Sequence, residues 1–192
     1  MKIDLEQIFS GQTVYVVASG ESLREFDFEK LRGKNVIVVN DVFKYVPFAQ
    51  VLVSLDTGYI KRNKHELKKF PGYKITLCGK GHPGWNYFID QGVSEDLSIL
   101  RKVKNSGFYA MVAALKLGAE KIYLLGFDIT WKEQPYFYDI PRDKINSYRS
   151  SMHHKDKHLR YFEYYKDQNI INASPDSAIA CFPKCKLNEI WT

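Results

Sequence analysis

Three histidines near the end of this 192-residue sequence are its best candidates for acid–base chemistry. His153, His154 and His158 lie close to the expected start of a charged, aromatic-rich helix. A neutral imidazole can act as a general base because its unperturbed pKa, about 6.5, is close to physiological pH. His154 and His158 are four residues apart, as the two histidines of the zinc motif H-E-x-x-H are. No glutamate follows His154, which argues against a metal. A solvated, basic helix start is the alternative interpretation.

Two short loops have the residue types of an anion site. The first, residues 18–23 (ASGESL), has neither the glycine spacing of a dinucleotide fingerprint nor the Gly-Lys-Ser/Thr of a P-loop. The second, Asn105-Ser106-Gly107, precedes the clearest helix of the sequence, where N–H groups lie at the positive end of the helix dipole. A tight strand-to-helix turn and an ordinary N-cap by Ser106 are the structural alternatives.

Hydroxyl and carboxylate side chains supply further candidates. Tyr136, Tyr138 and Tyr148 have hydroxyls that could donate hydrogen bonds to a departing phosphate, or rings that pack a long loop onto the protein. Asp128 follows the strand-like segment KIYLLGF and is a candidate to contact a ribose or to cap the next turn. No Ser–His–Asp arrangement with a nucleophile elbow and no paired-carboxylate metal motif accompanies them.

The elements that must position these residues alternate between strands and helices. Short apolar runs rich in β-branched residues predict parallel strands over residues 13–18, 35–40, 50–55, 74–78, 121–125 and 169–173. Helices are expected over residues 23–31, 106–117 and 155–166. This alternation predicts one Rossmann-like α/β domain over residues 1–192, with a mostly parallel sheet, helices on both faces and a lid-like loop at about 130–150.

Small and polar residues follow the predicted strands. They are Ser19, Gly20, Asn40, Asp56, Cys78, Gly126 and Asp128. Ligands of open parallel sheets bind outside the carboxyl ends of the strands. The sequence therefore predicts a binding site at this edge.

Composition limits the class of protein. Apolar residues make up 45% and charged residues 26%, as in soluble globular proteins, which excludes a disordered, collagen-like or disulfide-scaffold chain. No signal sequence and no apolar run long enough for a membrane span is found, so we expect a cytoplasmic protein. The net charge of +6 is compatible with peripheral contact with an anionic membrane. Cys181 and Cys185 lack the further ligands of a zinc site and are expected to be reduced thiols.

Four segments, in this order, resemble a known family. They are VYVVASGESLREFDFEKL, VVND, NSGFYAMVAALKLGAEKIYLLGFDI and MHHKDKHLRYFEYYKDQNIINASPDSAIACF. Over residues 14–182 the chain resembles the metal-independent bacterial sialyltransferases of lipooligosaccharide synthesis, as a shortened member of bacterial or phage origin. The resemblance implies inverting transfer of sialic acid, or a related sugar, from a CMP-activated donor to a sugar hydroxyl. It implies no metal and no cofactor beyond the donor.

Matching the segments residue by residue assigns roles by resemblance. The base falls on His153, and the second of two phosphate-stabilising tyrosines falls on Tyr136. The first falls on Thr130, where Tyr138 or Tyr148 would have to substitute.

The donor-binding positions also follow from this match. They are Ser19, Gly20, Asn40, Asp56, Asn105, Ser106, Gly126, Asp128 and Ser177. The sequence departs from the family at Val103, where the family has an arginine, and at Ser19 and Asp56, where it has asparagines.

Two other functions are compatible with these residues. A pterin pyrophosphokinase-like enzyme of the same superfamily would need acids for Mg²⁺, and only Asp41, Asp56 and Asp128 are available, none of them adjacent. A non-catalytic nucleotide-sugar-binding protein would tolerate loss of His153. The expected partners are a nucleotide-sugar donor and a glycan acceptor, and not nucleic acid, because the lysine-rich stretches carry intervening acids. Self-association is left undecided by the sequence.

Overall fold

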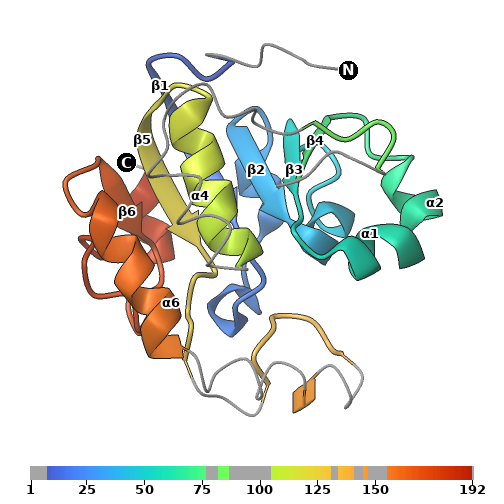
Figure 1. Ribbon diagram of the computed structural model, residues 1–192. Coiled ribbons are helices and arrows are strands. Elements are labelled where there is room, and N and C mark those ends of the chain that lie inside the picture. Colours follow the sequence, from blue (N-terminus) through green and yellow to red (C-terminus); the bar gives the residue numbers. More distant parts are fainter. Residues whose placement is uncertain are drawn as a thin grey trace.

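Short runs rich in β-branched residues form the sheet at the centre of the molecule. The structure, a computed structural model, describes residues 8–76, 82–86, 105–130, 134–140, 145–146 and 155–191. The six strands are β1 (Gln12–Val17), β2 (Asn35–Val39), β3 (Val51–Val53), β4 (Tyr73–Ile75), β5 (Ala119–Leu125) and β6 (Ile170–Asn172). They pair in parallel in the order β4-β3-β2-β1-β5-β6 (Figure 1). The predicted parallel α/β fold is confirmed, and each predicted strand run overlaps an observed strand.

Helices and 3₁₀ turns connect the strands. The α-helices are α1 (Thr57–Arg62), α2 (Lys64–Leu67), α4 (Ser106–Lys116) and α6 (Lys155–Phe162). The 3₁₀ turns are Glu21–Leu23, Phe28–Leu31, Asn40–Lys44, Glu163–Tyr165 and Leu187–Trp191. The helix expected over residues 23–31 is replaced by two of these turns. The Asp27 side chain accepts a hydrogen bond from the Glu29 N–H and starts a new turn there, which competes with a continuous helix.

Apolar side chains cover both faces of the sheet. On one face, α4 lies across the middle strands (Figure 1), and its Phe108 and Met111 pack with Val14, Val16 and the Phe162 of α6. On the other face, the first three 3₁₀ turns, α1, α2 and the C-terminal turn supply the cover. Alternate strand residues point to opposite faces, so the central strands are buried on both sides. The sheet is therefore a rigid support for the loops at its edges.

Candidate functional site

A cleft of about 520 Å³ lies at the carboxyl ends of the central strands. It occurs at a topological switch point, because β2 to β4 extend from β1 in one direction while β5 and β6 lie on its other side. Residues of the loops that follow β1 and β5 both line this space. The sheet order therefore places a ligand-sized space at the edge that the sequence predicted.

The loops after β1 and β5 approach each other at two glycines. The Gly20 N–H donates to the Gly126 carbonyl over 2.9 Å. A Cβ at Gly20 would lie 2.7 Å from the Asp128 Oδ2 and closer still to the Gly126 oxygen, so only glycine fits. Gly126 has a φ of +69°, a left-handed conformation that favours glycine. Both glycines are required by backbone geometry.

Asp128 ties the same two loops together. Its carboxylate is 7% exposed and accepts hydrogen bonds from the Ser22 N–H at 2.8 Å and the Ser22 hydroxyl at 2.6 Å. Hydrogen bonds to a carboxylate are stronger than neutral ones. Asp128 lines the cleft, but these two bonds hold the β1 loop on β5.

The start of α4 forms another wall and corrects one sequence prediction. Asn105, not Ser106, is the N-cap: its Oδ1 accepts from the Phe108 N–H over 3.0 Å. The Ser106 hydroxyl oxygen instead accepts from the Leu55 N–H, also over 3.0 Å, and links α4 to the end of β3. The sequence pattern could not distinguish two neighbouring polar residues whose partners lie at different distances along the chain. Asn105, Ser106 and Gly107 line the cleft, so the positive end of the α4 dipole, which favours an anion, lies at its wall.

Two tyrosines from the segment 134–140 line the cleft. This segment is fixed to the β1 loop, because the Phe137 N–H donates to the Ser19 carbonyl over 3.0 Å. The Tyr136 and Tyr138 rings stack with their centroids 5.6 Å apart. Burial, and then the nearby Asp41 carboxylate, raise the pKa of Tyr136 and of Tyr138 above the ordinary value. Both phenols therefore stay protonated, as hydrogen-bond donors, at neutral pH.

Asn40 has two unusual features at the end of β2. Its φ is +49°, a left-handed conformation that asparagine tolerates better than most residues. Its buried Oδ1 accepts no hydrogen bond within the described part of the chain. A buried acceptor without a donor is costly, so this oxygen at the cleft wall is suited to a donor on a ligand.

The acids of the cleft are each engaged by the protein. The Asp41 carboxylate lies 2.9 Å from the Lys44 ammonium and accepts from the Tyr59 hydroxyl at 3.4 Å. Asp56 caps α1 by accepting from the Tyr59 N–H and lies 3.9 Å from the Arg62 guanidinium. Across the described residues, no three His, Cys, Asp or Glu side chains come together as metal ligands would.

The cleft brings together nine of the eleven site residues predicted from the sequence. They are Ser19, Gly20, Asn40, Asp56, Asn105, Ser106, Gly126, Asp128 and Tyr136. Ser177 does not line it: this residue is buried, and its hydroxyl donates to the Phe127 carbonyl and accepts from the Ile179 N–H. His153 lies outside the described residues, as do His154, Tyr148, Val103 and Cys78.

Sequence reasoning missed several residues that the fold brings into the cleft. They are Tyr59 and Arg62 of α1 and Lys155 of α6, whereas His158 of α6, which also lines the cleft, was one of the three candidate histidines. The α1 residues carried no motif, and only the N-cap pattern Asp56-Thr57-Gly58 marked the helix that presents them. Arg62, which lies 3.9 Å from the Asp56 carboxylate, and Lys155 are the cationic side chains among the residues that line the cleft.

Two properties outside the cleft bear on the expectations from composition. Cys181 and Cys185 are free thiols. Within the described ranges, each helix is too short or too polar to cross a lipid bilayer.

Comparison with known proteins identifies similar structures but no similar sequence. No family model and no curated protein matches the chain. The chain is similar to the sialyltransferase CstII from Campylobacter jejuni in complex with the substrate analogue CMP-3FNeuAc, with a TM-score of 0.57 and 16% identity over 92% of this chain and 86% of that one. It is also similar to the apo α-2,3-sialyltransferase from Campylobacter jejuni, with a TM-score of 0.60 and 16% identity over 96% and 84% of the two chains.

A third similar structure is the MAf glycosyltransferase from Magnetospirillum magneticum. Its TM-score is 0.56 and its identity 15%, over 96% of this chain and 35% of that one. At this level of identity the three comparisons establish a shared fold.

Proposed function

We propose that the protein is a glycosyltransferase that transfers sialic acid, or a related sugar, from a CMP-activated donor to a sugar hydroxyl with inversion. The observation that carries the proposal is the pair of stacked tyrosines, Tyr136 and Tyr138, that line a cleft at the switch point of the sheet. The similar fold of CstII, a sialyltransferase whose structure holds CMP-3FNeuAc, supports the assignment of the donor.

The nucleotide part of the donor would lie between the loops after β1 and β5. Gly20 and Gly126 line the cleft at this point, and their close approach holds the two loops together. Asn40, whose Oδ1 lacks a donor within the described residues, is suited to accept a hydrogen bond from the nucleoside. The phosphate would lie toward the first turn of α4, where the helix dipole stabilises negative charge.

The two tyrosines would stabilise the leaving group. As the bond from the anomeric carbon to the phosphate oxygen breaks, negative charge develops on CMP and positive charge on the sugar ring. Phenol hydroxyls that are already oriented and protonated can donate hydrogen bonds to that phosphate without reorganisation. Tyr138 would take the position that the resembled family fills with a tyrosine and this chain fills with Thr130.

The acceptor hydroxyl would attack from the opposite face of the sugar and lose its proton to an imidazole. We assign this base to His153 on the resemblance, and the released CMP carries the electron pair of the broken bond. General base catalysis of this kind contributes about 10²–10⁴-fold to the rate. His158 on α6 lines the cleft and is the second imidazole to test.

With a CMP-activated donor, we expect the reaction to take place in the cytoplasm. A lipid-linked glycan acceptor would bring the basic protein to an anionic membrane surface.

The test is release of CMP from CMP-sialic acid, with and without a lactose acceptor, in buffer containing EDTA. We expect acceptor-dependent turnover that persists in EDTA and falls about 10²-fold or more in His153→Ala. His154→Ala and His158→Ala identify the base by elimination. His65→Ala is the matched control, because His65 is an exposed histidine on α2, outside the cleft.

Each outcome discriminates between functions. Turnover that is lost in EDTA and restored by Mg²⁺ would contradict a metal-independent transfer. CMP binding without turnover, unchanged in His153→Ala, would favour a non-catalytic nucleotide-sugar-binding protein. Absence of both turnover and CMP binding would refute the proposal.

A further inference from the structure

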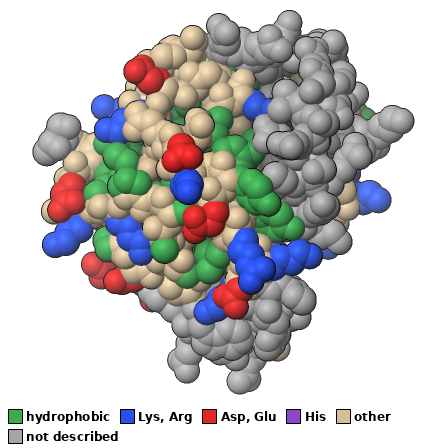
Figure 2. Space-filling model, turned by 60° about the vertical axis from the view of Figure 1, so that its left-hand side comes forward, with side chains coloured by type: hydrophobic (Ala, Val, Ile, Leu, Met, Phe, Trp, Pro, Cys, Tyr) green, Lys and Arg blue, Asp and Glu red, His purple; other side chains and the backbone are tan. Residues whose placement is uncertain are grey.

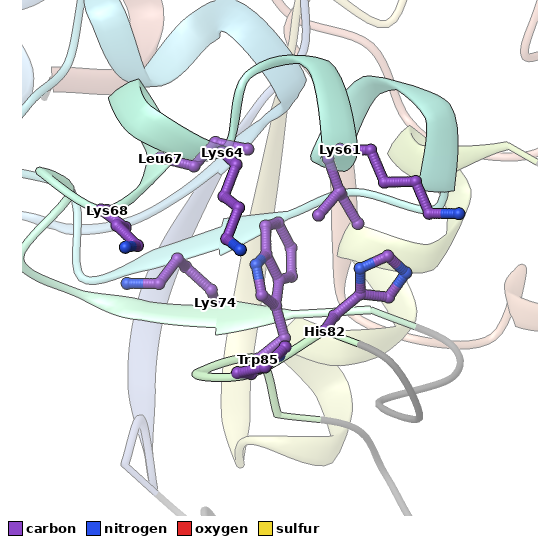
Figure 3. Close-up of a pocket in the computed structure, with 9 residues that line it drawn as sticks. Lys61, Lys64, Leu67, Lys68, Lys74, His82 and Trp85 are labelled. Carbon is purple, nitrogen blue, oxygen red and sulfur yellow. The ribbon is translucent and has the colours of Figure 1, made fainter.

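A second pocket, of about 170 Å³, lies beside the cleft on the other side of α1. Tyr59 and Arg62 of α1 line the cleft, whereas Ile60 and Lys61 line this pocket. We call it the lysine pocket. Its residues are Ile60, Lys61, Lys64, Leu67, Lys68, Lys74, His82, Pro83 and Trp85 (Figure 3).

The positive charges of the lysine pocket come from separate elements. Lys64 and Lys68 belong to α2 and the residue that follows it, and Lys74 belongs to β4. In Figure 3 their ammonium groups lie on one side of the Trp85 indole, while His82 lies on the other. The convergence is a product of the fold, because β4 is the edge strand of the sheet and Leu67 of α2 belongs to the same apolar cluster as Trp85.

Among the described residues, these ammonium groups have no acidic partner. In the ranges that the structure describes, Lys61, Lys64, Lys68 and Lys74 form no ion pair. The acid of α2, Glu66, instead lies 3.1 Å from the ammonium of Lys44. Elsewhere the described surface mixes both signs, as Figure 2 shows for one face. The lysine pocket thus concentrates uncompensated positive charge.

Lys74 shows that part of this charge is desolvated. Its side chain is partly buried and its ammonium donates to the Phe70 carbonyl over 3.1 Å. Burial lowers its pKa below the ordinary value for lysine. An ammonium has three N–H donors, so one bond to a carbonyl leaves two for a ligand. An anion in the pocket would restore the interactions that burial removes.

The floor of the pocket is apolar and fixed. Leu67 is 2% exposed and Trp85 is 7% exposed. The segment that carries Trp85 is tied to β4 by hydrogen bonds from the Asn86 N–H to the Lys74 carbonyl and from the Thr76 N–H to the Asn86 carbonyl. A ligand here would meet a preformed wall, which lowers the entropic cost of binding.

We propose that the lysine pocket binds a compact phosphate monoester, whose phosphate contacts Lys64, Lys68 and Lys74 and whose body lies against the wall formed by Trp85 and Leu67. A phosphate monoester carries nearly two negative charges at neutral pH, which matches several ammonium groups better than a single carboxylate does. The pocket volume of about 170 Å³ equals that of about six water molecules at about 30 Å³ each. This space is enough for a phosphate and part of one ring, and it is too small to enclose a nucleotide. This inference does not depend on the function proposed for the cleft.

The test is calorimetric titration with glucose 6-phosphate, glucose and inorganic phosphate, and sedimentation with vesicles that contain phosphatidic acid. We expect glucose 6-phosphate to bind, inorganic phosphate to bind about tenfold more weakly and glucose not to bind. The double variant Lys64→Met and Lys68→Met should weaken binding about 10²-fold while keeping the aliphatic stems. The matched control is Lys30→Met with Lys34→Met, two exposed lysines outside the pocket, which should change binding less than about twofold.

The outcomes separate the sources of the ligand. Lysine-dependent binding of glucose 6-phosphate assigns the pocket to a soluble ester, and lysine-dependent binding of the vesicles alone assigns it to a lipid headgroup. The proposal would be overturned if Lys30→Met with Lys34→Met weakened binding as much as the pocket variant does. It would also be overturned if neither glucose 6-phosphate nor the phosphatidic acid vesicles bound. Titration of the same variants with CMP shows whether the cleft is affected, so that failure here is distinguishable from failure of the proposed glycosyltransferase.

Discussion

Replacement of Gly20 by alanine should separate the two loops on which the cleft depends. The added Cβ would lie 2.7 Å from the Asp128 Oδ2 and closer to the Gly126 carbonyl oxygen, whereas ordinary contacts begin near 3.4 Å. One loop must therefore move by about 1 Å. Such a movement breaks the hydrogen bond from the Gly20 N–H to Gly126 and strains both hydrogen bonds between Ser22 and Asp128.

The energetic cost follows from the bonds at risk. A backbone hydrogen bond contributes about 0.5–1.5 kcal/mol and a hydrogen bond to a charged group about 1.5–3 kcal/mol. Because the loops can relax and keep part of the carboxylate interaction, we expect a loss of about 2–4 kcal/mol in the free energy of unfolding. With a urea dependence of about 2 kcal/mol/M, the unfolding midpoint should fall by about 1–2 M.

The assay is urea denaturation followed by circular dichroism, together with CMP binding under native conditions. Gly58→Ala is the control, since Gly58 lies in α1 and its added Cβ would approach side-chain atoms alone, the Arg62 guanidinium at 3.0 Å and the capping Asp56 Oδ1 at 3.1 Å. We expect that control to keep the wild-type midpoint or to raise it slightly, because alanine favours a helix. A Gly20→Ala midpoint within about 0.2 M of the wild type would refute the close approach of the two loops.

Four further predictions follow from single side chains. Asn105→Ala should lower the free energy of unfolding by about 1 kcal/mol, as loss of an N-cap does, and Asn105→Asp should restore it in a thermal melt. Tyr136→Phe should reduce turnover about 10²-fold while CMP affinity changes only a few-fold, and equal losses in both would contradict its role at the leaving group. Burial and the Asp41 carboxylate raise the pKa of Tyr59, so the unfolded state loses this proton at a lower pH than the folded state does. The free energy of unfolding should therefore fall as pH rises above about 10, and it should fall less steeply in Tyr59→Phe. Burial raises the pKa of the Cys181 thiol to about 11, so its alkylation by iodoacetamide should accelerate about tenfold per pH unit between pH 8 and 10, and a rate that levels off below pH 9 would contradict the burial.

Local patterns were sufficient to predict the strands and the clearest helix. The runs around Val14–Val17 and Val36–Val39 are short, apolar and β-branched. The restricted χ1 rotamers of β-branched residues favour a strand over a helix. Gly118, which directly follows the helix predicted over residues 106–117, has a φ of +90°, a conformation that favours glycine at a helix end. These features depend on neighbours within a few residues, which is the range over which sequence patterns carry information.

Local patterns failed where distant partners decide the outcome. Ser106 and Asn105 are both good N-cap residues, and the choice between them depends on Leu55, which is 51 residues away and reaches Ser106 only after β3 and α4 pack. The helix expected over residues 23–31 instead follows the Asp27 cap and forms two 3₁₀ turns.

The candidate site divides in the same way between sequence and tertiary structure. The sequence by itself placed small and polar residues after the strands, and parallel pairing alone brings such residues to one edge. Only the tertiary structure decided that Tyr59 and Arg62 join them and that Ser177 turns inward to the Phe127 carbonyl. It also brought the ammonium groups of α2 and β4 around Trp85. The physical reason is that strand order and helix packing, which involve residues far apart in the chain, determine which side chains share a cavity.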